Sequence, residues 1–409
     1  MRPHVIFAPL VFHAMIAWCA AAGTNGSRPA ANPRKPGDAR PDDAAAKQGA
    51  ALCHSGDGAA LFERWVGNPL FPVDRSANWR SIHIANAAVL TASESPDGLW
   101  RLYVRGSGRF PRETPDRQRN YHDSIGLFTQ EAESFSPYGP WKPYEGNPVL
   151  FHGSAESYDG KHLLDCCPVW GKQPDGQADV LYLYYKGVSY EDGGCIAGAY
   201  SADGGYTFRR FRTNPLKRLA GPCDVVCHQN RYYIFYGDAQ VDPVTRKATE
   251  RLKIYLSITP NPDCMENVPH QLAVDVGPSG SFDERSVHGA RIFRLRGRWF
   301  MVYQASAKHF DYPERFHAAT STDLVHWTKV SSPTPLFMRG APGQWDQGAI
   351  WFGEVFEHDQ RLYMLYEGWG WEGNDFDRRR AYAKPGRSQV GIASVAVDRF
   401  LEWCGMAEP

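Results

Sequence analysis

The sequence predicts an all-β fold, a single five-bladed β-propeller closed by pairing of its N- and C-terminal strands. Three observations support this prediction. Hairpin patterns recur along the chain, and x-Pro turns recur with gaps of 79, 67 and 120 residues, the last being twice about 60. In addition, the 409 residues include 39 Gly and 30 Pro, which suits a chain with many turns better than a helical one. A repeat that holds four strands is typical of propeller blades.

The N-terminus predicts export. Residues 1–22 combine the positive charge of Arg2, the short apolar run "VIFAPLVFHAMIAW" and small residues up to Ala22, as in a signal peptide. The run is too short to predict a membrane span. We expect a secreted or periplasmic protein, and Cys19 leaves a lipid-anchored form as the alternative. Residues 23–50 lack aromatic side chains and predict a disordered linker before a domain at 51–409.

Five segments share one layout, in which small residues and an apolar strand are followed by a turn and a second strand that often ends on Gly. These segments are 85–106, 165–187, 223–237, 288–304 and 347–370. Their second strands alternate aromatic and aliphatic residues with a period of two, which indicates β-structure. We therefore expect each segment to form the inner hairpin of one blade.

A second repeated element follows the hairpins. Segments 199–216 and 319–336 both contain a strand, a Ser-x-Asp turn, an aromatic residue and a closing x-Pro-Leu, and 126–149 is a longer version. The x-Pro turns begin at Asn68, Asn147, Asn214 and Thr334. Two β-sandwiches would not repeat aligned hairpins in this way, and a right-handed β-helix has shorter repeats.

The two ends of the domain predict how the ring closes. Segment 388–403 has a strand pattern but no hairpin after it. We expect it to join residues 61–71 in one blade, which would remove long exposed sheet edges. Cys53 and Cys404 flank this region and could form a disulfide, as an exported chain permits.

Composition limits the partners. The chain has 45 basic and 45 acidic residues and no net charge, so it has no electrostatic signature for nucleic acid or an acidic membrane. Its 13% aromatic content suits a neutral partner such as a sugar. We expect a monomer that binds carbohydrate, without nucleic acid and without a membrane span.

The repeats resemble the five-bladed glycosidases of families 43, 32, 68 and 117, together with the family 130 mannoside phosphorylases. The resemblance covers the chain after about residue 51, and it is one of architecture. It implies a glycan-processing site in the central funnel, at the N-terminal ends of the innermost strands. Segment 201–208, "SADGGYTF", resembles the Asp-box turn of sialidases, which implies a structural turn on the rim.

Cleavage of a glycosidic bond uses one protonated acid and one carboxylate that acts as base or nucleophile. Candidate catalytic residues are therefore the acids near the starts of the inner strands: Asp165, Asp224 and Glu284. Asp224 lies near the place where family 43 normally has a Glu, which here is Ala220. We expect Asp165 or Asp224 to act as base and Glu284 or another carboxylic acid as proton donor.

Five further residues are candidates for substrate binding. Asn86 resembles the Asn of the mannoside phosphorylases and could hydrogen-bond a hydroxyl. His288 directly precedes an inner strand, and Asp346 precedes another. Trp369 and Trp371 could stack on a sugar face, or they could pack between blades. The structural alternative for Asp346 is that it holds a rim loop.

The sequence thus predicts a secreted glycoside hydrolase that acts on a neutral polysaccharide or oligosaccharide. One alternative is a glycoside phosphorylase or transferase, which a basic pair converging on the funnel floor would favour. The other is a non-catalytic carbohydrate-binding propeller. Arg105 and Arg291 are interpreted as ion-pair partners. We expect no required cofactor, and the resemblance is compatible with a structural cation in the axial channel, for which His288 is a candidate neighbour.

Overall fold

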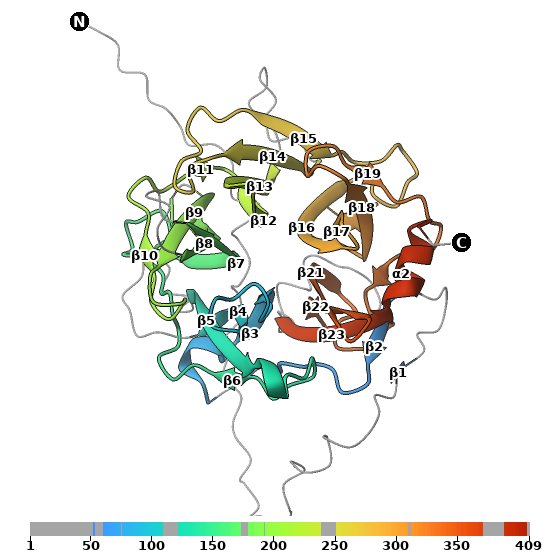
Figure 1. Ribbon diagram of the computed structural model, residues 1–409, viewed down its shortest axis with the longest axis horizontal. Helices are drawn as coiled ribbons and strands as arrows, with labels where there is room; N and C mark the ends of the chain where they lie inside the picture. The colour runs from blue at the N-terminus through green and yellow to red at the C-terminus, as the bar shows by residue number, and fades with distance from the viewer. Residues whose placement is uncertain are drawn as a thin grey trace, which may run out of the picture.

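Five antiparallel sheets surround a common axis, as the ribbon of the computed structural model shows (Figure 1). The structure describes residues 52–53, 60–74, 76–108, 122–172, 179–191, 193–238, 251–309, 312–370 and 388–406. The predicted five-bladed propeller is confirmed. The predicted signal peptide at 1–22 and linker at 23–50 lie outside the described residues.

Each blade is built from consecutive strands, starting at the axis. The inner strands are β3 (His83–Leu90), β7 (His162–Lys172), β12 (Gly221–His228), β16 (Ser286–Leu295) and β21 (Ala349–His358). The second strands are β4 (Leu99–Gly108), β8 (Asp179–Val188), β13 (Arg231–Asp238), β17 (Arg298–Ser306) and β22 (Arg361–Trp369). The third strands are β5 (His122–Glu131), β9 (Gly194–Ser201), β14 (Lys253–Thr259), β18 (Arg315–Ser321) and β23 (Ser388–Ala396).

The outer edges of the first four blades are short strands: β6 (Lys142–Pro143), β10 (Arg209–Arg210), β11 (Lys217–Arg218), β15 (His270–Val274), β19 (Thr328–Lys329) and β20 (Phe337–Met338). Two 3-10 turns, η1 (Asn78–Arg80) and η2 (Ala132–Ser134), accompany the first blade. The first and second strands of each blade form the hairpins that the sequence predicted, so the alternation of apolar residues located these hairpins correctly.

The last blade is closed by the N-terminus. Strand β2 (Glu63–Trp65) pairs antiparallel with β23, and β1 (Leu52–Cys53) adds outside it. The predicted pairing of the two ends is therefore confirmed. A short helix, α2 (Val397–Trp403), follows β23. Cys404 carries a free thiol, so the suggested Cys53–Cys404 disulfide is not formed, and strand pairing and non-covalent side-chain contacts join the ends.

The recurring Asn-Pro turns attach the outer part of a blade to its third strand. The side-chain amide of Asn214 accepts the N–H of Gly198 at 2.9 Å and donates to its carbonyl at 2.8 Å. Asn147 makes the same pair of bonds to Leu127, and Asn68 makes it to Ile392. Because each side-chain amide bonds both the N–H and the carbonyl of one strand residue, it extends the hydrogen-bonding pattern of the sheet.

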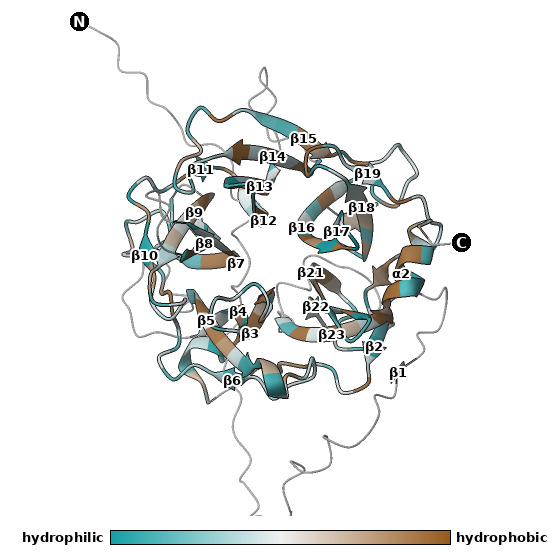
Figure 2. Cartoon of the chain, viewed as in Figure 1, coloured by the Kyte–Doolittle hydropathy of each residue, from teal (hydrophilic) through white to brown (hydrophobic). Residues whose placement is uncertain are grey.

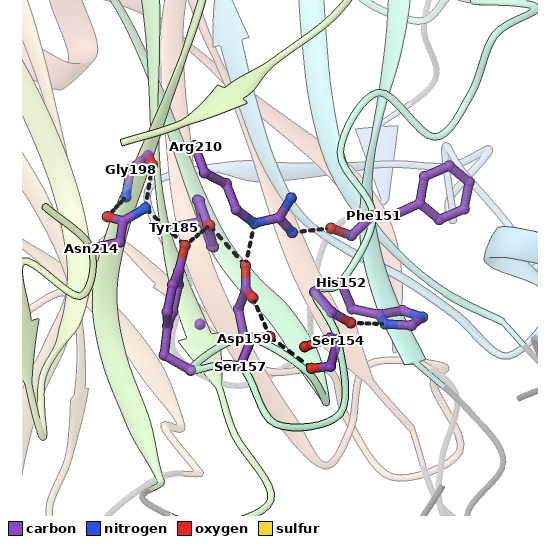
Figure 3. Close-up of polar contacts among 12 residues, drawn as sticks. Phe151, His152, Ser154, Ser157, Asp159, Tyr185, Gly198, Arg210 and Asn214 are labelled. Atoms are coloured by element: carbon purple, nitrogen blue, oxygen red, sulfur yellow. Dashed lines mark hydrogen bonds and ion pairs between the residues drawn. The ribbon is translucent and has the colours of Figure 1, made fainter. Parts of the chain in front are cut away.

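A second repeated device lies in the loops that lead into three inner strands. Each loop ends in an aromatic residue followed by a buried Asp: Asp159, Asp283 and Asp346. Asp159 accepts hydrogen bonds from Arg210 at 2.7 Å and Tyr185 at 2.9 Å (Figure 3). Asp283 pairs likewise with Lys329. The Asp thereby ties the loop to the outermost strand of the same blade.

Glycines that end second strands make room for aromatic residues of the segments that lead into the inner strands. A Cβ added at Gly106 would lie 2.2 Å from the Trp79 ring, and one at Gly368 would lie 2.5 Å from the Trp345 ring. Any larger side chain would displace the loop. The recurring Gly of the sequence is thus a packing requirement.

Hydrophobic residues carried by the strands of all five blades form the core (Figure 2). They gather in five main clusters, one at each interface between adjacent blades. The cluster between the fourth and fifth blades also includes Phe400 of α2. Since every sheet packs face to face against two neighbours, the ring holds the inner strands in fixed mutual positions.

Candidate active site

Each inner strand is irregular at a corresponding position near its start, where a β-bulge interrupts the pairing with the second strand. Four bulges place one residue at a positive φ: Asn86 (46°), Asp165 (53°), Gly289 (53°) and Phe352 (49°). Asn and Asp tolerate this conformation better than other residues with a side chain. Bulges re-aim side chains and often lie beside active sites.

The structure brings Asn86 and Asp165 together, as the sequence predicted for residues at the starts of inner strands. The Asp165 N–H lies 3.4 Å from Asn86 Oδ1. Asn86 also donates from Nδ2 to Glu367 Oε2 at 2.8 Å. The Asp165 backbone and the Glu367 carboxylate, from different blades, therefore meet at one amide, and the nearby charge of Asp165 contributes to raising the pKa of Glu367.

Glu367 belongs to a second set of residues that sequence reasoning missed. They lie on the second strands, opposite the residue that precedes each bulge: Arg105, Lys186, Tyr236, Gln304 and Glu367. Arg105 NH2 lies 3.2 Å from Glu367 Oε1. The same register in every blade explains why these side chains gather near the bulges.

Asp165 is buried, and burial raises the pKa of its carboxyl, whereas the charges of Lys186, Arg105 and Arg291 lower it. None of the described residues hydrogen-bonds its carboxyl oxygens. Lys186 lies close to Asp165, because both side chains approach Gly221. A Cβ added at Gly221 would lie 3.1 Å from Lys186 Cδ and 3.5 Å from Asp165 Oδ2. Asp165 thus combines burial with an unoccupied carboxyl, which is typical of catalytic acids.

Glu367 differs from Asp165 in its partners. Burial raises the pKa of Glu367, and the Arg105 charge opposes that rise. Its two oxygens are engaged by Arg105 and Asn86. The Glu367 carboxyl is therefore held by direct ionic and hydrogen-bonding partners, which the Asp165 carboxyl lacks among the described residues.

Asp123 anchors the other side of Arg105. Its carboxylate lies 2.8 Å from His162 Nδ1 and 3.9 Å from Arg105 Nε, and Ser107 donates to it. Burial alone would raise the pKa of Asp123, but the charge and hydrogen bond of His162, with Arg105, hold it below its usual range. Asp123 is therefore a fixed carboxylate that orients Arg105.

Asp224 lies one step further along its inner strand, past the bulge. It accepts the N–H groups of Ile292 at 2.7 Å and Val225 at 2.8 Å, and lies 3.8 Å from Arg291. Glu354, at the same position of β21, lies 3.2 Å from Arg291. Asp224 and Glu354 thus both lie against Arg291, and the remaining contacts of Asp224 are with backbone N–H groups.

The remaining acidic candidates lie at the rim. The Glu284 carboxylate accepts the Gly280 N–H at 2.5 Å, within the turn before β16. Asp346 is fully buried and is paired with Arg64 at 2.9 Å and Tyr366 at 3.1 Å. Neither carboxylate contacts Asp165 or Glu367 in the part of the chain that the structure describes, so both have the contacts of structural residues.

His288 is also buried. Burial, followed by the nearby charge of Lys186, lowers the pKa of His288 to about 3. Its ring lies over Gly237, where a Cβ would approach Nε2 to 2.6 Å. His288 is therefore neutral and is placed to offer or accept a hydrogen bond.

Aromatic side chains border the site on the fifth blade. Trp369 packs 5.8 Å from Trp351 and stacks on His83 at 6.1 Å, measured between ring centroids. Tyr312 lies 6.2 Å from Trp369. Trp371 lies outside the described residues. No cluster of three or more His, Cys, Asp or Glu side chains suited to a metal ion occurs among the described residues.

No family model matches the sequence, and no curated protein matches it. Similar solved structures include β-1,2-mannobiose phosphorylase from Listeria innocua, with 12% identity, a TM-score of 0.56, and coverage of 84% of this chain and 99% of the other. A glycoside hydrolase has 13% identity and a TM-score of 0.51 over 79% and 89% of the two chains. An N-acetylgalactosamine deacetylase from F. plautii has 12% identity and a TM-score of 0.51 over 85% and 97%.

The chain is thus a five-bladed β-propeller with the architecture of glycoside hydrolases and phosphorylases. At these identities the likeness concerns the fold, and chemistry has to be argued from the site. Within the described ranges, no helix is long and apolar enough to cross a membrane.

Proposed function

We propose that this protein is a glycoside hydrolase whose proton donor is Asp165 and whose base is Glu367. The observation that carries the proposal is the pair of buried acids that contact Asn86, Asp165 through its backbone N–H and Glu367 through its carboxylate, with the Glu367 carboxylate held by Arg105 and the Asp165 carboxyl without a hydrogen-bond partner among the described residues. Asp165, with its raised pKa, would protonate the glycosidic oxygen as the bond to the anomeric carbon breaks. Glu367 would take a proton from the attacking water.

The substrate that fits this proposal is a neutral polysaccharide or oligosaccharide outside the cytoplasm. The aromatic border at Trp369 and Trp351 would stack on sugar rings. His288, neutral at physiological pH, would hydrogen-bond a hydroxyl. Export is proposed from the pattern of residues 1–22.

A panel of aryl glycosides with leaving groups of different pKa tests the assignment. Asp165→Asn should lower kcat about 100-fold with a poor leaving group and much less with a dinitrophenolate, which needs no proton. Glu367→Ala should lose activity that azide restores as a glycosyl azide. Glu357→Gln is the control, since Glu357 lies at the far end of β21 and pairs with Arg296 at 3.6 Å.

Full activity of Asp165→Asn on every leaving group would exclude Asp165 as the acid. Tight binding of a glycan with no turnover of any substrate would instead indicate a carbohydrate-binding propeller.

A second candidate function, phosphorolysis, is favoured by one observation. The Lys186 side chain forms no ion pair or hydrogen bond with the described residues, yet it lies near Asp165. The Arg105 charge also acts on Asp165. These two cations could hold a phosphate whose oxygen attacks the anomeric carbon while Asp165 protonates the departing oxygen. Added phosphate should then raise the rate and yield a sugar phosphate, and Lys186→Met should abolish that dependence. Formation of free sugar regardless of phosphate supports hydrolysis.

A further inference from the structure

Arg291 occupies the centre of the ring of inner strands, one step beyond the bulges. It is almost fully buried and touches three inner strands besides its own β16. Its NH2 donates to the Cys166 carbonyl at 3.1 Å, and its NH1 donates to the Cys223 carbonyl at 2.9 Å. Its Nε lies 3.2 Å from Glu354 Oε2. A single guanidinium thereby joins β7, β12 and β21.

We propose that Arg291 is the positioning residue for Asp165, an inference that rests on the proposed function. The Cys166 carbonyl belongs to the residue that directly follows Asp165 in the bulge, where φ of Asp165 is 53°. A fixed charged donor on that carbonyl restrains the bulge and hence the direction of the Asp165 side chain. The Cys223 carbonyl receives the same restraint in the next blade.

The planar guanidinium suits this task, because its rigid fork of donors is pre-organised to reach two carbonyl groups at once, whereas an ammonium has rotatable donors on a flexible stem. The ring of Phe352, the bulge residue of the fifth blade, lies 4.9 Å from the guanidinium carbon. Three bulges from three blades therefore pack around Arg291.

The charge of Arg291 is balanced by Asp224 and Glu354. Burial raises the pKa of both carboxyl groups, and Arg291 opposes the rise in each. The other groups that face this cluster are Glu94 from the β3–β4 turn and the thiols of Cys166 and Cys167 from β7. Asp224 and Glu354 therefore share one cation, Arg291.

Arg291 also acts on Asp165 through its charge, which lowers the pKa of that carboxyl after the larger effects of burial, Lys186 and Arg105. The two roles can be separated. Arg291→Met removes both the charge and the donors, whereas Arg291→Lys keeps the charge and loses the fork.

The test compares both variants with wild type in kcat, KM, the pH profile and carbon-13 NMR titration of the Asp165 carboxyl, identified by subtracting the Asp165→Asn spectrum. Arg291→Met should lower kcat about 100-fold with little change in KM, and should move the Asp165 titration to higher pH. Arg291→Lys should titrate nearly as wild type but keep a kcat at least about tenfold low.

Arg101→Met is the matched control. Arg101 is also fully buried and also donates to a carbonyl, that of Gly204 at 2.9 Å, but its carboxylate partner is Asp97 in the β3–β4 turn. It should lower the melting temperature without altering the Asp165 titration.

A folded Arg291→Met or Arg291→Lys protein with wild-type kcat, or an Arg291→Met titration like that of Arg101→Met, overturns the proposal. If wild type turns over no substrate, the proposed function fails, while the NMR titration still decides whether Arg291 acts on Asp165.

Discussion

At the scale of single residues, the site depends on what surrounds each carboxyl group. Asp165 and Glu367 are buried and Asp224 is partly buried, and all three acids lie on strands of the ring, yet Asp224 is engaged by Arg291 and by two backbone N–H groups. Glu367 is engaged by Arg105 and Asn86. Only the Asp165 carboxyl, of these three, lacks a bonding partner among the described residues. Its availability separates it from the other two.

This environment predicts the pH dependence of Lys186→Met. The positive charge of Lys186 favours the ionised form of Asp165 and lowers its pKa. Its removal should raise the pKa of Asp165. If Asp165 is the proton donor, activity is lost as pH rises through that pKa, so the alkaline limb of kcat/KM should move to higher pH. A shift of the acidic limb instead would assign Asp165 as the base.

At the scale of elements, the blade is attached by repeated side-chain devices outside its hydrophobic faces. Asn68, Asn147 and Asn214 each bond both backbone groups of one residue on a third strand. The sequence predicted these turns as repeat markers, because x-Pro turns recur along the chain between the hairpins. The side-chain bonds explain why Asn recurs there.

We predict that Asn214→Ala lowers the free energy of unfolding by about 1–3 kcal/mol, because it leaves the N–H and carbonyl of Gly198 without their partners. The site residues lie on other strands, so kcat should be unchanged. Urea denaturation measures the loss. Asn261→Ala is the matched control, since Asn261 also precedes a Pro but has an exposed side chain. Equal effects of the two substitutions would contradict the anchoring role.

At the scale of the whole molecule, the ring is closed by a few residues near the N-terminus. Strand β2 contributes Arg64, which lies 2.9 Å from the fully buried carboxylate of Asp346 and also donates to the Met338 carbonyl. Closure therefore joins the N-terminal strand, the loop into the fifth inner strand and the edge of the fourth blade. Asp346 was a candidate for substrate binding, and its contacts are those of this closure.

We predict that Arg64→Met lowers the free energy of unfolding by about 3–5 kcal/mol, because it leaves the Asp346 carboxylate buried without a cation. Arg64→Met combined with Asp346→Asn should be less destabilised than the sum of the two single variants. Denaturant unfolding of the four proteins measures this coupling. Strict additivity would show that the pair does not act together.

Sequence reasoning identified Asp165 and Asn86 because both stand where an inner strand begins, and repeats make that position visible. Arg105, Lys186 and Glu367 also had a signal: in an apolar second strand, each is the charged residue directly before the closing Gly. From the sequence, that Gly was interpreted only as the end of the second strand. In the structure it leaves room for an aromatic side chain of the loop that leads into the inner strand. Glu284 and Asp346 were selected because each precedes an inner strand in the sequence. In the structure, Glu284 bonds within its own turn, and Asp346 pairs with Arg64 of β2.

The sequence by itself determined the all-β class, the five repeats, the hairpins and the joining of the two ends, because these follow from the periodicity of apolar residues and from turn chemistry. Tertiary structure decided which acids meet. A one-residue bulge changes where a side chain points. Asn86, which contacts the Asp165 backbone, and Arg291, which lies against Asp224, come from other blades, distant in the chain. Such contacts leave no periodic trace, since they depend on how the sheets pack around the axis.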